Sequence, residues 1–166
     1  MVAQAPKRSR TKARNGARLA AVQALYQMDL AKTDLNAVVV EFAEHRFREA
    51  SDEVGHAEVE VGFFHDLLKG VVDRQREIDP LIDKQLAAGW RLARLDSILR
   101  AILRSATYEL LARPDVPAKA VIGAYVDIAH DFFAGDEPKV VNGVTDKLAH
   151  KLRAGELGPT DKAASE

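Results

Sequence analysis

Apolar residues recur at steps of three and four along most of the chain, the spacing typical of α-helices with one buried face. The first stripe predicts a helix from about Lys12 to Ala31, among alanines and other good helix formers. A second stripe follows Asp34, a residue suited to capping a helix N-terminus, and ends near residue 50. A third helix is expected over about Val59–Ile78, and Pro80 should end or kink it.

The second half of the chain repeats this pattern. A short helical stretch is expected near 81–88, followed by the clearest helix of the sequence, Leu95–Leu110, which Asp96 can cap. Two further helices are predicted over about Val121–Phe132 and Lys139–Leu152. Strand-like alternation bounded by hairpin turns is missing from the sequence, so the pattern predicts an all-α fold of six or seven short helices.

The pattern also predicts a division of the chain into segments. Residues 1–11 hold almost nothing to bury and are expected to form a flexible basic arm, and residues 155–166 a disordered tail. Residues 12–154 are expected to form the helical domain. We expect two small bundles that share one core, about 12–80 and 81–154, because an acidic half and an arginine-rich half meet near Pro80.

Composition narrows the class of protein. With 47% hydrophobic and 30% charged residues, the chain has the balance of a soluble globular domain. It has no cysteine, which permits a reducing compartment and makes the cytoplasm the default location. No stretch is long and apolar enough to cross a membrane, and the start lacks the apolar core of a secretory signal.

The net charge of −1 conceals an uneven distribution. Residues 1–18 hold six basic residues and no acidic one, whereas the rest of the chain holds 18 basic and 25 acidic residues. A basic arm on an acidic body acts locally on a polyanion while the body resists nonspecific binding. This asymmetry favours a nucleic-acid partner.

Signatures of catalysis are missing from the sequence. No two of the five histidines have the three- to five-residue spacing of a zinc helix, and the glycines form neither a dinucleotide fingerprint nor a phosphate-binding loop. No serine lies in a nucleophile elbow. The sequence therefore disfavours an enzyme and predicts neither a metal nor a cofactor.

The signal for nucleic acid lies in the first helix. Arg14 and Arg18 are four residues apart on a ridge that continues to Val22 and, with some drift, to Tyr26. Basic groups followed by a phenol would give phosphate contacts and a stacking platform for single-stranded RNA. The alternative, that Tyr26 fills the core and the arm adds solubility, stays equally open. A second basic group is better explained by structural roles, one of them an Asp96–Arg100 pair: Arg91, Arg94, Arg100, Arg104 and Arg113.

Three segments together resemble the bacterial transcription antitermination factor NusB family: ARLAAVQALYQMDL (17–30), LDSILRAILRSATYELLARPDVPAKAVI (95–122) and GDEPKVVNGVTDKLA (135–149). The resemblance implies an all-helical protein of two perpendicular subdomains without enzymatic activity. It also implies binding of the boxA element of nascent ribosomal RNA operon transcripts, together with the ribosomal protein NusE. The complex then joins RNA polymerase and other Nus factors so that transcription passes terminators.

The resemblance also implies site residues. Those matching the family's RNA surface are Arg10, Lys12, Arg14, Arg18, Gln23, Tyr26, Asp136 and Lys139. Asn142–Gly143 matches the family's Asn-Gly pair, which suits helix packing as well as RNA contact. The partner-binding surface is implied only as a region, 81–113.

Three departures from the family pattern affect these surfaces. Asn15–Gly16 interrupts what is a tighter arginine run in some relatives, Val140 replaces a residue that is often aromatic, and Leu99 one that is often acidic. Two alternatives to the family function remain open. One is a helical protein-binding adaptor with a solubility arm, and the other is an RNA-binding accessory domain of the ribosomal RNA methyltransferase type without catalytic activity.

Overall fold

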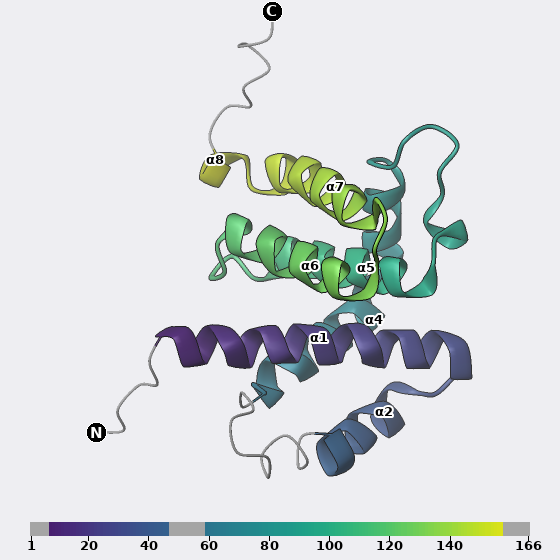
Figure 1. Ribbon diagram of the computed structural model, residues 1–166, viewed down its shortest axis with the longest axis vertical. Coiled ribbons are helices and arrows are strands. Elements are labelled where there is room, and N and C mark those ends of the chain that lie inside the picture. Colours follow the sequence, from purple (N-terminus) through teal and green to yellow (C-terminus); the bar gives the residue numbers. More distant parts are fainter. Residues whose placement is uncertain (1–6, 47–58, 158–166) are drawn as a thin grey trace, which may run out of the picture. The chain divides into compact units, whose positions relative to one another are not determined.

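The computed structural model describes residues 7–46 and 59–157, and this part of the chain is all-α, as predicted (Figure 1). The helices, with the π-helical turn η1 and the 3₁₀ turn η2, are α1 (Lys7–Ala31), α2 (Leu35–Glu41), η1 (Phe42–Arg46), α4 (Val61–Asp83), η2 (Leu92–Arg94), α5 (Ser97–Ala112), α6 (Ala118–Phe132), α7 (Glu137–Leu152) and α8 (Ala154–Leu157). The chain forms two compact units that meet within α4, one ending at Asp73 and the other beginning at Arg74.

Helix boundaries differ from the expectations in three places. The end of the predicted arm is helical, because α1 begins at Lys7 and its basic residues are good helix formers. Pro80 does not end α4, which continues to Asp83; the ring removes only the one backbone bond that residue 80 would donate to the Arg76 carbonyl. The separate helix expected near 81–88 is wrong, since α4 ends there and gives way to a turn that includes Gly89 at φ +87°. Residues 1–6, part of the predicted second helix beyond residue 46, and most of the expected tail lie outside the described residues.

The core of the first unit is built by α1, η1 and α4. Small and apolar residues of α1 are buried, and Phe42 of η1 stacks on Phe64 of α4 with ring centroids 5.4 Å apart. Asp34 caps α2 as predicted, accepting a 2.9 Å hydrogen bond from the Ala37 amide. The buried apolar residues of this unit are Ala17, Ala20, Ala21, Val22, Ala24, Leu25, Val38, Phe42, Phe63, Phe64, Leu67, Leu68 and Val71.

In the second unit α5, α6 and α7 pack against one another. Helix α5 is buried along nearly its whole length, and Asp96 caps it as predicted by accepting from the amides of Ile98 and Leu99 at 2.8 and 3.3 Å. At the end of α4, Asp79 accepts two hydrogen bonds of 2.9 Å from the guanidinium of Arg104. This bidentate pair fixes the last turns of α4 against α5.

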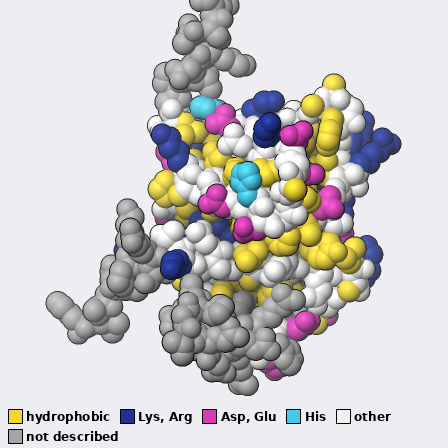
Figure 2. All heavy atoms as spheres, in the orientation of Figure 1, with side chains coloured by type: hydrophobic (Ala, Val, Ile, Leu, Met, Phe, Trp, Pro, Cys, Tyr) yellow, Lys and Arg dark blue, Asp and Glu magenta, His cyan; other side chains and the backbone are white. Residues whose placement is uncertain are grey.

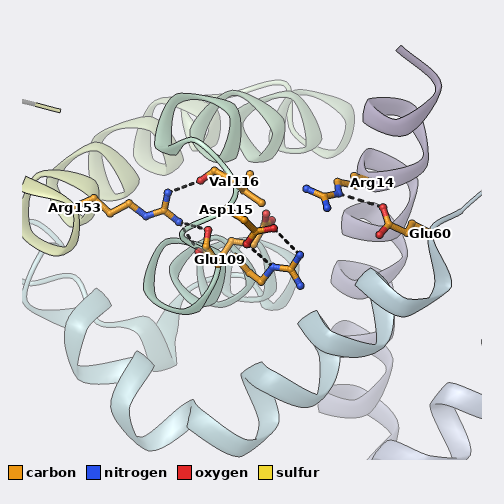
Figure 3. A network of polar contacts seen from close by, with 7 residues as sticks. Arg14, Glu60, Glu109, Asp115, Val116 and Arg153 are labelled. Carbon is orange, nitrogen blue, oxygen red and sulfur yellow. Dashed lines mark hydrogen bonds and ion pairs between the residues drawn. The ribbon is translucent and has the colours of Figure 1, made fainter. Parts of the chain in front are cut away.

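Arg153, between α7 and α8, closes the end of the second unit (Figure 3). Its guanidinium is buried and donates to the carbonyl oxygens of Leu110, Glu109 and Arg113 at 2.9, 2.8 and 2.6 Å, and to that of Val116. These carbonyls lie at the C-terminal end of α5 and in the loop after it, where some backbone acceptors, such as that of Leu110, lack a helical partner. One side chain thus satisfies a helix end.

Within the described part of the chain, no helix has the length and apolar character needed to cross a membrane.

Candidate nucleic-acid interface

The N-terminal turns of α1 present positive charge. Arg10 and Lys12 are exposed, and the first turn contains no acidic residue. Cations at a helix N-terminus add to the positive end of the helix dipole instead of offsetting it, which is unfavourable for the helix but favourable for a bound anion. This end of α1 therefore suits phosphate groups.

Arg14, one turn further along, is already engaged inside the first unit (Figure 3). Its Nε lies 3.2 Å from Oε2 of Glu60, and its guanidinium carbon lies 5.0 Å from the ring centroid of Phe63. About a third of the side chain, 32%, remains exposed. Arg14 is thus accessible from solvent while paired with a carboxylate.

The expectation that Arg18 offers its charge to phosphate does not fit its position. Arg18 is 3% exposed, donates to Oδ1 of Asn15 at 2.8 Å, and has its guanidinium 5.2 Å from the Phe63 ring centroid. The ridge that Arg18 shares with Val22 faces the interior, because Val22 is fully buried. Arg18 therefore lies on the buried side of α1, where it packs against Phe63.

Gln23 and Tyr26 are half-buried on another side of α1. At about 100° per residue, both lie within about 40° of Lys12 around the helix, whereas Arg14 and Arg18 lie about 120–160° away from it. The predicted residues of α1 therefore divide between two faces, with Lys12, Gln23 and Tyr26 on one. Tyr26 is neither fully in the core nor fully exposed, so its burial alone does not decide between core packing and stacking.

Asp136 and Lys139 lie in the second unit, at the start of α7. Both side chains are almost fully exposed, and Lys139 Nζ lies 3.7 Å from Asp136 Oδ1. Basic and acidic side chains are interspersed on the face of this unit seen in Figure 2. Unlike the start of α1, this surface carries charges of both signs.

Sequence reasoning missed a hollow in the second unit. Its volume is about 300 Å³, and the indole of Trp90 beside it is 54% exposed. The Asp83 carboxylate holds the loop by accepting from the Leu92 amide at 2.8 Å. A lone tryptophan after Gly89, in a loop rich in arginine, was the signal available. The hollow is lined by Gly89, Trp90, Arg91, Arg94, Leu95, Asp96, Leu99, Asp136, Glu137 and Val140.

The second basic group separates into two kinds of arginine. Arg91 and Arg94 are exposed beside the hollow. Arg104 binds Asp79, Arg113 pairs with Asp115 at 2.9 Å, and Arg100 donates to the Ala93 carbonyl at 3.1 Å. These three arginines have structural roles, as expected, although Arg100 donates to the Ala93 and Leu95 carbonyls and to Ser97, whereas the sequence predicted a pair with Asp96.

Among the described residues, no three His, Asp or Glu side chains gather as a metal site would require.

Comparison with known proteins adds sequence relatives. The family model described as "NusB family" matches residues 15–150. The chain is 49% identical over 146 residues to the transcription antitermination protein NusB of Bradyrhizobium sp. strain BTAi1, covering 88% of this chain and 86% of that protein. It is 46% identical over 154 residues to the protein of the same name from Maricaulis maris, covering 93% and 96%.

Solved structures with the same fold are also found. NusB of T. maritima superposes with a TM-score of 0.69 at 28% identity, over 91% of this chain and 96% of the other. A chain from a crystal structure of the antitermination factors NusB and NusE in complex with double-stranded RNA gives a TM-score of 0.64 at 25% identity, over 88% and 99%.

Proposed function

This chain belongs to the NusB family, and from that premise we propose that it is a transcription antitermination factor without enzymatic activity. It binds boxA RNA of nascent ribosomal RNA operon transcripts together with the NusE ribosomal protein, and helps assemble the antitermination complex with other Nus factors on RNA polymerase. Its place of action is the cytoplasm, where bacterial transcription occurs. The match of the family model over residues 15–150 carries the proposal, and the exposed basic start of α1 supports it.

We assign the RNA contacts of α1 by exposure. Arg10 and Lys12 meet phosphates, and Arg14 contributes once its internal partner gives way. Gln23 and Tyr26, on the face of Lys12, meet bases. The buried Arg18 holds α1 against Phe63 and does not contact RNA in this proposal.

Lys139 and Asp136 form a second, weaker contact in this proposal. Lys139 is exposed enough to meet a phosphate, and the Asp136 carboxylate accepts hydrogen bonds of the kind that exocyclic amino groups of bases donate. Their mutual ion pair is exposed and easily exchanged.

For the NusE partner we propose the part of the hollow formed by residues 89–99, which falls within region 81–113; the remaining lining residues, Asp136, Glu137 and Val140, lie outside that region. An exposed aromatic side chain beside apolar Leu95 and Leu99 is the composition of an interface anchor. Arg91 and Arg94 supply a charged rim. The position often acidic in relatives is the buried Leu99 here, so the hollow has an apolar side chain at that position.

Salt dependence of RNA binding tests the phosphate contacts. For single-stranded RNA, the slope of log K against log salt changes by about 0.7 for each phosphate neutralised. The double variant Arg10→Gln/Lys12→Gln should therefore have a slope shallower by about 1.4. The matched control is Lys119→Gln/Lys147→Gln, which removes two exposed lysines of the second unit. Equal slopes for the two double variants would contradict the assignment.

Tyr26 requires a pair of variants. Tyr26→Ala should weaken binding to boxA RNA by about 1–3 kcal/mol if the ring stacks on a base, and Tyr26→Phe should keep most of the affinity because it keeps the ring. Loss of the fold in Tyr26→Ala with no change of affinity in the folded fraction would support the core alternative. Thermal unfolding and RNA titration of the same samples separate the two.

The partner assignment is tested by calorimetric titration with purified NusE. Trp90→Ala should lower NusE affinity by at least tenfold if the indole is an interface anchor. Phe132→Ala is the matched control, because Phe132 is a large exposed apolar residue of the same unit, 37% exposed, outside the hollow. The same affinity for the two variants would place the partner elsewhere.

A further inference from the structure

A short segment before α4 is attached to α1 at Arg14. The Glu60 amide donates to the Ala13 carbonyl at 3.1 Å, and the Glu60 carboxylate then reaches the Arg14 guanidinium. Beside this contact, a Cβ on Gly16 would lie 3.3 Å from Cγ2 of Val59, closer than an ordinary contact. The glycine thus leaves room for the segment to approach the helix. Backbone, side chain and glycine all place one carboxylate at Arg14.

The pair changes what Arg14 offers to a phosphate. A guanidinium beside a carboxylate carries little net charge, so a phosphate gains little at Arg14 unless it takes the place of Glu60. The two side chains are 32% and 42% exposed, so solvent screens their attraction and exchange is inexpensive. Phe63 contacts the guanidinium from within the first unit and does not compete for its charge.

We propose that Glu60 is an intramolecular competitor for RNA phosphate at Arg14, and that it determines how much of the basic charge of α1 is available to RNA. The inference rests on the proposed function, because it concerns RNA binding at the same helix. It assigns a role to an acidic residue that lies outside the basic pattern of α1. Binding at this position is an exchange of partners instead of the simple addition of a charge pair.

Neutralising the competitor should strengthen RNA binding. Glu60→Gln should raise the affinity for a short single-stranded RNA by about 1.5- to 5-fold at low salt, the range of an exposed ion pair. Glu41→Gln is the matched control, because it removes the same charge from the first unit, where the Glu41 carboxylate is bonded to the neutral Gln27 at 2.7 Å. Improper folding of Glu60→Gln would lower affinity, so a gain in affinity is not produced by structural damage.

A double-mutant cycle with Arg14→Gln localises the effect. On an Arg14→Gln background, Glu60→Gln should raise affinity no more than Glu41→Gln does. In the wild-type background, Arg14→Gln should flatten the salt slope by less than the roughly 0.7 expected for one phosphate. In the Glu60→Gln background, Arg14→Gln should flatten the slope by about 0.7. The slope change of Arg14→Gln in the wild-type background tests the proposal even if Glu60→Gln is poorly folded, because that measurement does not use the Glu60→Gln protein.

The outcomes separate this inference from the proposed function. A gain in RNA affinity with Glu60→Gln that exceeds the gain with Glu41→Gln, and that disappears on the Arg14→Gln background, supports the role of Glu60 as a competitor. An unchanged or lower affinity of folded Glu60→Gln protein, or a gain equal to that of Glu41→Gln, overturns it, and a full slope change for Arg14→Gln in the wild-type background does the same. Wild-type protein that fails to bind boxA RNA, alone and with NusE, refutes the proposed function itself.

Discussion

Replacing Arg153 by methionine tests whether one buried cation holds the second unit together. The substitution keeps the apolar stem and removes every donor. Arg113 N donates to the Glu109 carbonyl and Val116 N to that of Arg113, so these two acceptors keep a backbone partner. Leu110 has no such replacement, because the residue four positions later is Pro114, which lacks an N–H.

The magnitude follows from the acceptors that lose their donor. The carbonyls of Leu110 and Val116 belong to residues only 2% and 3% exposed. A buried polar group without a partner costs about 1–3 kcal/mol, so Arg153→Met should lower the free energy of unfolding by about 2–6 kcal/mol. Most small domains have only about 5–15 kcal/mol in total, so the variant should be severely destabilised.

Urea unfolding provides the assay. Far-UV circular dichroism reports on the helices, and the fluorescence of Trp90, the one tryptophan of the chain, reports on the second unit. Arg113→Met is the matched control, because the guanidinium of Arg113 pairs with Asp115 at the surface and its loss should cost about 0.2–1 kcal/mol. If Arg153→Met loses no more stability than this control, the view of Arg153 as the cap of α5 is refuted.

Two further predictions concern the same unit. Glu156 accepts from the Ala118 amide at 2.6 Å, and this hydrogen bond, followed by the contact with Arg153, lowers the pKa of its carboxyl from the ordinary 4.5. Its contribution is therefore complete above pH 4.5 and is lost as pH falls through the lower folded-state pKa, so the stability difference between wild type and Glu156→Gln should shrink in acid; a difference that stays constant to pH 2 would contradict this. Asp96→Ala should cost about 0.5–2 kcal/mol in urea unfolding. Asp136→Ala should cost less, because Asp136 makes no side-chain cap bond to α7, and equal losses would count against the capping argument.

Local signals in the sequence were enough to predict much of the fold. The helix over 95–110 and the N-caps Asp34 and Asp96 depend on residues within a few positions of one another, and the structure confirms them. The ends of helices were less predictable. Pro80 removes only its own bond to the Arg76 carbonyl, and α4 continues past it to Asp83. The start at Lys7 follows from helix propensity where no apolar stripe marks it.

The candidate site was harder to predict because it depends on distant residues. Periodicity placed Arg14, Arg18 and Tyr26 near one ridge but did not show which side of α1 faces inward. That side is set by Phe63, which lies beneath both arginines, and by Glu60, 46 residues from Arg14. The exposure of Trp90 likewise follows from how the loop folds back to Asp83. The assignments of RNA and partner contacts remain predictions for the variants described above.

The burial of Arg18 affects how genetic screens of this protein should be interpreted. A selection for antitermination-defective alleles would recover Arg18 substitutions beside those of Arg10, and both would be recorded as losses of a basic residue from the same helix. We expect the two classes to differ in the cell, because loss of the buried Arg18 beside Phe63 destabilises the first unit, and destabilised protein is removed by proteolysis. Immunoblotting of each allele before it is mapped onto an RNA footprint would keep unstable variants out of that map.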